Sequence, residues 1–539
     1  MEYPEIKNER FTVQYIITIN DKRSIEEHAS DITLEQTVEV PVDCIPEKHF
    51  EDGIIGIVEN IGLSGDIPNQ YIVSISYRTD ITEFSIPQFF NVLFGNISLK
   101  NNIRISDITF SKSFFSVYKG PNYGIDGIRK LLGVYGRALA CSALKPMGLP
   151  IKELSKMASL LAKGGIDLIK DDHGISNQKF HPFKERASRC QEAVEKVNAD
   201  RESKTLYFPT VSGRFEEIEE QVQHVLKEGI RGILIAPMLV GPDTVRYIAD
   251  KYNLIIMAHP ALTGTHFHDP THGIAPSVFL GTLFRMLGAD ISVFPHAGGR
   301  FHFTEKDCLT TSNSLRCTNG SWKSSFPCPA GGINMDRISE INELYGADSV
   351  FLIGGSLMQH STDLSYSTNV FMQKIKSLYK ERLCAPEEPF ASSCEIPSKP
   401  EQIINHPIMK GEDFKWLGRF VEEYKTDQGF DFSSINRQEL IGKFGEKTAF
   451  DLRYFEIEPG GYSSRERHVH EHVIIGVRGN GILIKGDSSF NISVHDVAYI
   501  SPLEKHQLRN EEKGPFGFFC IVDHKRDKPI VIKDDIISY

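Results

Sequence analysis

The sequence predicts a multidomain chain of mixed class: an α+β domain, a (β/α)8 barrel and a small all-β barrel. Three observations lead to this prediction. The 539 residues suffice for about three domains. Between residues 137 and 356, eight short apolar runs recur, most of them followed by a polar loop and an amphipathic segment. After residue 417, apolar and polar residues alternate between glycine turns.

The first 118 residues combine alternating strands with one apolar helix. The segments 11–19 and 71–77 alternate with a period of two, which is typical of strands, and 86–95 reads as a helix. These elements predict a small α+β domain over residues 1–118.

The eight apolar runs predict a TIM barrel over residues 119–383, with one strand and one helix per step. They span 137–146, 165–172, 205–212, 232–239, 254–262, 291–297, 325–332 and 349–356. Glycines and polar residues gather at the carboxyl ends of these runs. Barrel enzymes carry their catalytic groups at that end, so the sequence predicts an active site there.

Residues 384–416 are rich in Pro, Ser and Glu and are predicted to be a linker. The strands that follow predict a separate all-β domain over residues 417–539.

The charge balance and the cysteines limit the classes of function. With 60 basic and 71 acidic residues the net charge is −11, which disfavours general binding to nucleic acid. No apolar run reaches the length of a membrane span, and the first residues have no signal-peptide pattern. The nine cysteines include no CxxC pair. We therefore expect a cytoplasmic protein with reduced thiols.

The second barrel strand ends in the charged segment Lys170-Asp171-Asp172-His173. Alternation along a strand places Lys170 and Asp172 on one face, toward the barrel mouth. A lysine beside acids most often forms an ion pair, but other strand ends here also carry reactive or flexible residues. These are Lys145, His259 and His296, and the glycine pairs Gly331-Gly332 and Gly354-Gly355. Glycine pairs after the last two strands are typical of a phosphate site in this fold.

The order of motifs from about residue 10 to 380 resembles the large subunit of ribulose-bisphosphate carboxylase (RuBisCO). The resemblance is closer to the non-carboxylating form IV relatives, the RuBisCO-like proteins. The motifs are EQTVEVP (35–41), FGN (94–96), LKP (144–146), GGIDLIKDD (164–172), HAGG (296–299), AGGI (330–333) and GGS (354–356). The resemblance implies a ferredoxin-like α+β domain before the barrel.

The resemblance also implies roles for individual residues. Lys170 matches the lysine that forms a carbamate with carbon dioxide, and with Asp172 and His173 it would hold Mg²⁺. Lys145 matches a proton-shuttling lysine, and His259 and His296 match active-site histidines. One phosphate would be bound by the two glycine pairs, that is by Gly331, Gly332, Gly354 and Gly355. Glu35 and Asn96 match residues that complete the site of the neighbouring subunit, which implies a homodimer.

Several departures from the carboxylases exclude carbon dioxide fixation on ribulose bisphosphate as the expected activity. His173 stands where carboxylases have a glutamate ligand, and Met147 stands in place of a lysine. The loop after the sixth strand has no lysine at the carboxylase position. At the second phosphate site, Pro260 and Ala330 replace polar residues. The substrate is therefore expected to carry one phosphate and a less polar group at its other end.

The loop after the fifth strand contains an HxHxxxH spacing formed by His266, His268 and His272. It could bind a metal ion, or it could cap the substrate with polar side chains. The second interpretation is favoured, because a loop does not impose a fixed geometry on that spacing.

In the C-terminal domain, Glu466, His468, His470 and His472 share parity and would face one side of a strand. With His506 they resemble the metal-binding motifs of the cupin family. Such ligands would suit Mn²⁺, Fe²⁺, Ni²⁺ or Zn²⁺. Whether Glu466 or His470 acts as a ligand stays open.

The two resemblances together suggest an enzyme of methionine salvage. One group of RuBisCO-like proteins isomerises 5-methylthioribulose 1-phosphate through enediolates, and in that pathway a cupin then removes the methylthio group with a small thiol. One alternative is a sugar-acid phosphate decarboxylase or hydrolase, with Arg300 binding a carboxylate. Another is a 2,3-diketo-5-methylthiopentyl-1-phosphate enolase, with the cupin as a ligand-sensing module.

Overall fold

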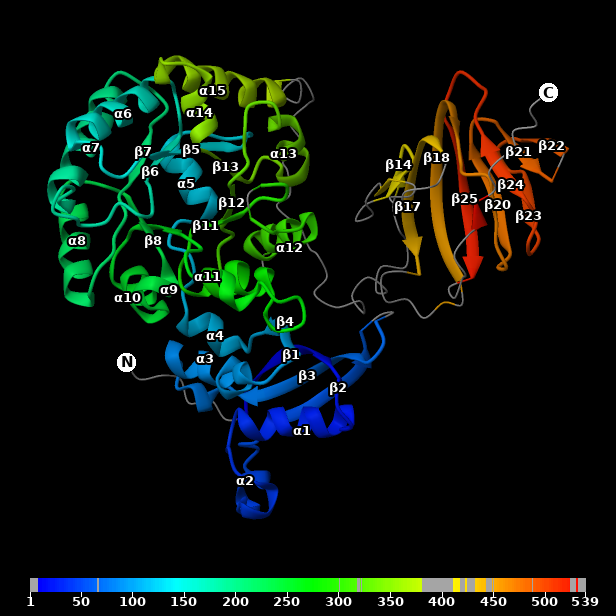
Figure 1. Cartoon of the computed structure of the whole chain (residues 1–539), viewed down its shortest axis with the longest axis horizontal. Helices are drawn as coiled ribbons and strands as arrows, with labels where there is room; N and C mark the ends of the chain where they lie inside the picture. Colours follow the sequence, from blue (N-terminus) through cyan, green and yellow to red (C-terminus); the bar gives the residue numbers. More distant parts are fainter. Residues whose placement is uncertain are drawn as a thin grey trace. The chain divides into compact units, whose positions relative to one another are not determined.

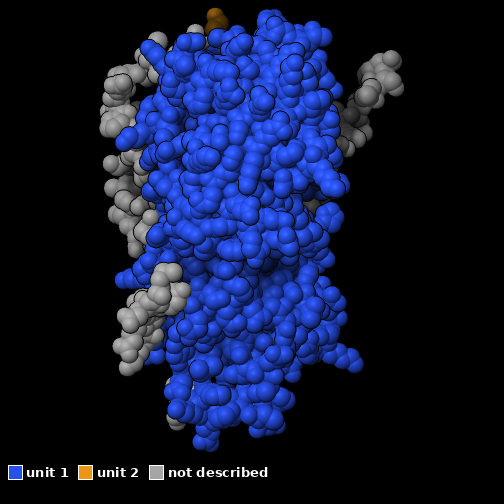
Figure 2. Space-filling view, turned by 90° about the vertical axis from the view of Figure 1, so that its left-hand side faces the viewer, with its two compact units in different colours: residues 1–394 blue, residues 395–539 orange. Residues whose placement is uncertain are grey.

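The computed structural model describes two compact units, formed by residues 1–394 (Figure 2) and 395–539. The residues described are 8–64, 67–299, 301–317, 320, 322–380, 411–416, 422–423, 432–442, 448, 450–486, 488–523 and 530–531. Each unit has its own hydrophobic core and is treated separately below.

The first unit begins with an antiparallel sheet backed by helices (Figure 1). Its strands are β1 (Arg10–Thr18), β2 (Ile57–Leu63), β3 (Gln70–Arg78) and β4 (Ile103–Thr109), in the order β4-β1-β3-β2. The helices are α1 (Ile25–Glu35), α2 (Glu47–Glu51), α3 (Ile86–Phe94) and α4 (Lys112–Val117). Burial alternates along β1, because every second side chain points into the core. This connectivity is the ferredoxin-like arrangement that the sequence predicts.

Eight parallel strands then form the barrel, and they coincide with the eight predicted runs. They are β5 (Leu139–Leu144), β6 (Leu168–Asp171), β7 (Leu206–Phe208), β8 (Gly232–Ile235), β9 (Ile255–Ala258), β11 (Ile291–Pro295), β12 (Phe326–Ala330) and β13 (Val350–Ile353). A parallel bridge between Thr210 and Leu234 joins β7 to β8 and closes the ring.

Helices surround these strands (Figure 1). They are α6 (Ile151–Lys163), α7 (Phe183–Asn198), α8 (Phe215–Lys227), α9 (Pro237–Val240), α10 (Pro242–Lys251), α11 (Phe284–Met286), α12 (Glu305–Arg316), α13 (Ile338–Tyr345), α14 (Gly355–His360) and α15 (Leu364–Lys380). A further helix, α5 (Gly124–Leu132), packs Ile128 and Leu132 into the apolar interior of the barrel. None of the described helices combines the length and the apolar composition that a membrane crossing requires.

A short strand from the barrel extends the sheet of the first domain. β10 (Gly273–Ile274), in the segment after β9, pairs in parallel with Arg104 and Ile105 of β4. The loop that carries the HxHxxxH spacing is therefore attached to the ferredoxin-like domain.

The second unit is an antiparallel β-structure, as the sequence predicts. Its main strands are β17 (Ser433–Ile441), β18 (Phe450–Tyr462), β20 (His472–Arg478), β21 (Gly481–Lys485), β22 (Ser488–Ile492), β23 (Val497–Ile500), β24 (His506–Arg509) and β25 (Phe516–Asp523). Shorter strands are β16 (Glu422–Glu423), β19 (Glu466–Arg467) and β26 (Ile530–Val531). Apolar side chains from several strands, among them Ile474, Leu483 and Phe518, form its core.

The predicted linker, 384–416, lies outside the described residues up to position 410. Its last residues form a hairpin of β14 (Gly411–Glu412) and β15 (Lys415–Trp416). The Trp416 ring packs against Tyr454 of β18 at 5.0 Å between centroids. This hairpin therefore packs on the all-β unit.

Candidate functional site

Strand β6 separates two acidic side chains by alternation. Asp171 is fully buried and accepts hydrogen bonds from Arg186 Nε at 3.0 Å, from the Tyr207 hydroxyl at 2.8 Å and from the Thr210 amide at 3.0 Å. These contacts hold Asp171 on the face of the strand that is directed toward Arg186 of α7. Lys170 and Asp172 therefore point to the opposite face.

Lys170 is buried at the carboxyl end of the barrel interior. Its Nζ donates to the carbonyl of Asp171 at 3.0 Å, and 3% of the residue is exposed. Burial lowers the pKa of Lys170, while nearby Cys141 and Asp172 favour its charged form. A lysine with a lowered pKa has a larger neutral fraction, and only the neutral amine reacts with carbon dioxide.

His173 and His259 lie face to face beside this lysine. Their ring centroids are 4.3 Å apart with an interplanar angle of 11°, and His173 Nδ1 is 3.7 Å from a carboxylate oxygen of Asp172. Burial lowers the pKa of His259 well below its ordinary value, and Lys170 and His173 add to the effect. Four of the predicted site residues, at the carboxyl ends of β6 and β9, therefore come together at one edge of the barrel.

The donor set fits a divalent cation in part. Asp172 offers carboxylate oxygens, and a carbamate on Lys170 would add oxygens of the kind that Mg²⁺ prefers. His173 is close enough to Asp172 to complete such a set with a nitrogen ligand.

Lys145 directly follows β5, the first barrel strand, which lies between β6 and the last barrel strand, β13. A Cβ placed on Gly354 would lie 2.8 Å from Lys145 Nζ, so the ammonium group occupies the space that a side chain would need. The absence of a Cβ at position 354 therefore allows the lysine to reach the end of β13.

The glycine loops after β11 and β12 touch through their backbones. A Cβ on Gly299 would lie 2.1 Å from the carbonyl of Gly331, and one on Gly332 would lie 2.8 Å from Cα of Gly299. Gly331 and Gly332 also have φ values of +80° and +103°, which disfavour other residues. This packing brings the backbones of the two loops together near the rim, with the ring of Phe301 next to Gly331, and backbone amides of this kind are typical of an anion site.

His296 has a partner that sequence reasoning missed. Its Nδ1 is 2.9 Å from the hydroxyl of Tyr345 at the end of α13, while Nε2 is buried with no hydrogen-bond partner among the described residues. Burial, with Arg337 nearby, lowers the pKa of His296, which favours a neutral imidazole. No spacing motif links positions 296 and 345, so the sequence carried no signal for this pair.

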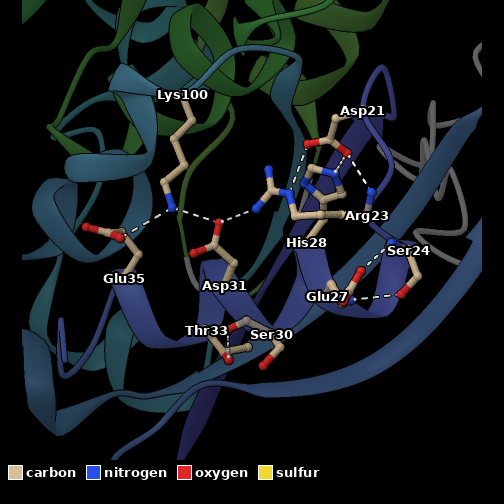
Figure 3. A network of polar contacts seen from close by, with 10 residues as sticks. All are labelled: Asp21, Arg23, Ser24, Glu27, His28, Ser30, Asp31, Thr33, Glu35 and Lys100. Atoms are coloured by element: carbon tan, nitrogen blue, oxygen red, sulfur yellow. Dashed lines mark hydrogen bonds and ion pairs between the residues drawn. The ribbon is translucent and has the colours of Figure 1, made fainter. Parts of the chain in front are cut away.

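Glu35 and Asn96 meet in the ferredoxin-like domain. Asn96 Nδ2 donates to Glu35 at 3.1 Å, and Lys100 Nζ lies 3.3 Å from the same carboxylate and 2.8 Å from Asp31. Figure 3 shows the charged network that continues from Lys100 and Asp31 to Arg23 and Asp21. The network holds the Glu35 carboxylate at the end of α1.

The HxHxxxH histidines do not converge. His266 stacks on Phe279 at 4.7 Å between centroids, and His272 contacts the Ser98 carbonyl at 3.1 Å and the Phe94 ring. The ring of His268 lies near that of His302, at 6.4 Å between centroids. The three histidines therefore do not form a joint metal site, and the favoured interpretation, a loop that caps the substrate with polar side chains, stays a prediction.

The residues that replace polar groups stand at the rim. Pro260 and Ala330 are half-buried, and Met147 is exposed with its methyl group directed toward Gly174 and Asp172. Arg300, the predicted carboxylate-binding residue, lies outside the described residues.

The all-β unit holds a cluster of three buried histidines. One nitrogen from each of His468, His472 and His506 lies within 4.8 Å of the others, and no other set of three His, Cys, Asp or Glu side chains converges in this way in the described part of the chain. Burial lowers the pKa of His468 to about 4, and burial with the neighbouring histidines lowers the pKa of His472 well below its ordinary value. Neutral imidazoles are the form that binds a metal ion.

Contacts at Nδ1 direct the remaining nitrogens toward the cluster. Nδ1 of His468 is 2.6 Å from the carbonyl of His470, and Nδ1 of His506 is 2.9 Å from that of Glu504. A proton on Nδ1 leaves the Nε2 lone pair free for an ion. The cluster therefore fits a transition metal such as Mn²⁺, Fe²⁺, Ni²⁺ or Zn²⁺.

The predicted continuous strand through these residues was wrong, because β19 ends at Arg467 and the next strand begins at His472. The break turns His470 aside, and its ring stacks on His468 at 3.7 Å between centroids. Glu466 is buried, pairs in register with His506 and accepts a hydrogen bond from Ser464 at 2.7 Å. Glu466 thus stays adjacent to the cluster as a candidate fourth ligand.

Family models match both units. The model of the ribulose bisphosphate carboxylase large chain, catalytic domain, matches residues 124–370. The cupin domain model matches residues 453–522.

Known proteins and structures resemble the first unit. A 5-methylthioribulose-1-phosphate isomerase of Rhodospirillum rubrum is 38% identical over 354 residues, which cover 65% of this chain and 92% of that protein. A 2,3-diketo-5-methylthiopentyl-1-phosphate enolase of Geobacillus thermodenitrificans is 29% identical over 367 residues, covering 65% of this chain and 88% of the enzyme. The crystal structure of a Rubisco-like protein from Rhodopseudomonas palustris has a TM-score of 0.63 and 35% identity, covering 71% of this chain and 100% of that one. The chain therefore belongs to the ribulose bisphosphate carboxylase large-chain family, as a RuBisCO-like protein with a C-terminal cupin domain.

Proposed function

We propose that the barrel is a sugar-phosphate isomerase that acts on 5-methylthioribulose 1-phosphate through an enediolate. The observation that carries this proposal is the group formed by Lys170, Asp172, His173 and His259 at one edge of the barrel. An amine with a lowered pKa at Lys170, the carboxylate of Asp172 and an imidazole with a lowered pKa at His259 suit proton transfer next to a carbonyl group. The similarity to the isomerase of Rhodospirillum rubrum supports the same choice.

In this proposal a lysine removes a carbon-bound proton next to the carbonyl and returns it one carbon further along the chain. Lys170, as a carbamate, and Lys145 are the two candidates for the base. His259 and His296 orient the substrate oxygens, and Tyr345 fixes the ring of His296. Lys170, Asp172 and His173 would hold Mg²⁺, which polarises a carbonyl group and stabilises an enediolate.

The substrate is oriented by its two unlike ends. The backbone amides around Gly331, Gly332, Gly354 and Gly355 bind the phosphate, and the amino group of Lys145 lies next to Gly354. The methylthio group lies toward Pro260 and Ala330, two apolar residues that stand half-buried at the rim. A substrate with two phosphates would leave one of them unpaired there.

The cupin acts on the isomerised product. The three histidines that would hold its metal ion, His468, His472 and His506, are buried. The methylthio group is transferred from carbon to the sulfur of a small thiol. The bond between the sugar carbon and the methylthio sulfur breaks, a mixed disulfide of the methylthio group and the thiol forms, and the thiol proton is transferred to the sugar carbon. This step needs the thiol as reductant and leaves the phosphate unchanged.

The test is direct turnover by the full-length protein with Mg²⁺, bicarbonate and 5-methylthioribulose 1-phosphate, followed by ³¹P and ¹³C NMR. We expect the carbonyl carbon to move while the phosphate ester persists. Unchanged substrate would contradict the proposal.

A second candidate, 2,3-diketo-5-methylthiopentyl-1-phosphate enolase, is favoured by the similarity to enzymes of that name. It uses the same proton chemistry on a diketone. Turnover of the diketone alone would favour this candidate, with the cupin as a ligand-sensing module.

A further inference from the structure

Cys520 in β25 contacts the histidine cluster of the cupin, formed by His468, His472 and His506, without being part of it. Its Sγ lies 3.4 Å from Nδ1 of His472, and both residues are buried. Nε2 of His472 has no hydrogen-bond partner among the described residues. The thiol therefore contacts the ring nitrogen that is left over when Nε2 serves the cluster.

The other two histidines are held differently. Nδ1 of His468 and of His506 contacts a backbone carbonyl, at 2.6 Å and 2.9 Å. Backbone carbonyls only accept hydrogen bonds, so they determine the tautomer of both rings. For His472 the partner at Nδ1 is the side chain of Cys520, and a substitution can remove that partner.

Arg453 makes the sulfur of Cys520 a hydrogen-bond acceptor. It pairs with Cys520 in register between β18 and β25, and its Nη2 donates to Sγ at 3.4 Å. A guanidinium only donates, so the sulfur accepts this bond. His472 offers an Nε2 lone pair to an ion only when Nδ1 carries the proton, and Nδ1–H then also donates to the sulfur.

We propose that Cys520 is a positioning residue of the cupin metal centre: its sulfur accepts Nδ1–H of His472 and thereby sets the tautomer and the orientation of that ligand. Arg453 fixes the sulfur from the other side. The inference rests on the proposed metal centre and adds a residue that acts on the ion through His472.

The test compares metal binding by the full-length protein and three variants. Cys520→Ala removes the acceptor, and we expect Co²⁺ and Zn²⁺ affinity to fall by about 10–100-fold. Cys520→Ser keeps an acceptor oxygen and should restore most of the affinity. Val522→Ala is the matched control, because Val522 is buried and lies opposite His472 in register but has no polar group in its side chain. We expect its affinity to stay near that of the unsubstituted protein.

The Co²⁺ absorption spectrum gives a second readout, since it reports ligand geometry. Cys520→Ala should shift the visible bands, and Val522→Ala should not. Thermal unfolding of the metal-free proteins checks that each variant folds.

Three results would overturn the positioning role: equal affinity of Cys520→Ala and the unsubstituted protein, an equal loss in Val522→Ala, or no recovery in Cys520→Ser. A sulfur-to-cobalt charge-transfer band would make Cys520 a ligand and contradict the proposal as well. Failure of the unsubstituted protein to bind either ion would instead contradict the metal centre itself.

Discussion

Lys170 and Lys145 at the barrel rim are the two candidates for the base that removes the carbon-bound proton. Lys170 and Lys145 both reach the site, but only Lys170 is buried beside Asp172. Replacing Lys170 with Met should lower turnover by about 10²–10⁴-fold, the usual contribution of a positioned base. Lys145→Met is the matched comparison, and turnover assays on both separate the roles. A larger loss in Lys145→Met would make Lys145 the main base.

The apolar end of the substrate site is tested by restoring polarity. Ala330→Ser places a hydroxyl next to the proposed methylthio position and should lower kcat/KM for the methylthio substrate by about tenfold. The analogue with a hydroxyl in place of the methylthio group should lose less. Equal losses for both compounds would place the methylthio group elsewhere.

For single residues, the sequence predicted which side chains face the site but not which side chains contact them. The alternation along 168–172 predicts that Lys170 and Asp172 share a face, because a strand has a fixed period. Tyr345 and Cys520 are far in sequence from His296 and His472, so no local pattern indicates those contacts. His470 was assigned to a strand because parity does not reveal where a strand breaks.

Strand β6 owes its geometry to the buried pair of Asp171 and Arg186. Their side chains are fully buried, with Nε and a carboxylate oxygen 3.0 Å apart. Arg186→Met should destabilise the barrel by about 3–5 kcal/mol, because it leaves a buried carboxylate without its counter-charge.

The control for that substitution lies on the same helix. Lys196 of α7 forms an exposed pair with Glu192. Lys196→Met should change stability by no more than about 0.5 kcal/mol. Thermal or urea unfolding measures both, and equal effects would contradict the structural role of Asp171.

A second buried acid makes the barrel sensitive to pH. Asp290, before β11, accepts backbone hydrogen bonds from Tyr123, Gly124 and Ile256 at 2.7–2.9 Å, yet burial raises its pKa to about 6. A folded pKa above the unfolded value of 3.8 means that the folded state binds the proton more tightly. The contribution of Asp290 to stability is therefore greatest below pH 3.8 and is lost as pH rises through about 6.

We predict the difference in melting temperature between the unsubstituted protein and Asp290→Asn. The other titrating groups are the same in both proteins, so their effect on the melting temperature cancels in this difference. Between pH 7.5 and pH 5, the melting temperature of the unsubstituted protein should rise relative to that of Asp290→Asn, whose amide does not titrate. A difference that stays constant over this range would contradict the raised pKa.

The elements of the barrel were predictable from their repetition, since eight apolar runs leave few other folds. The pairing of β10 with β4 was not, because two residues carry no periodicity and are held by a neighbouring domain. The hairpin at 411–416 was hidden in a segment rich in Pro, Ser and Glu, where its strands are too short to form a pattern.

The whole molecule is predicted to work as a dimer, in which Glu35 and Asn96 of one copy complete the barrel site of the other. Mixing Glu35→Ala and Lys170→Met chains should then restore activity that neither variant has alone. The expected yield is about a quarter of the original activity, since half of the randomly formed dimers are hybrids with one intact site. Absence of any recovery would show that each chain uses its own Glu35.

The account stands on one chemical claim, that the barrel rim removes a carbon-bound proton from a sugar with one phosphate and returns it to the neighbouring carbon. The most direct measurement is NMR of 5-methylthioribulose 1-phosphate incubated in D₂O with the full-length protein, Mg²⁺ and bicarbonate. We predict that the carbons next to the carbonyl take up deuterium, and that Lys170→Met abolishes the uptake. A substrate that keeps all its carbon-bound protons would contradict the claim, whereas equal uptake in the Lys170→Met variant would assign the proton transfer to Lys145.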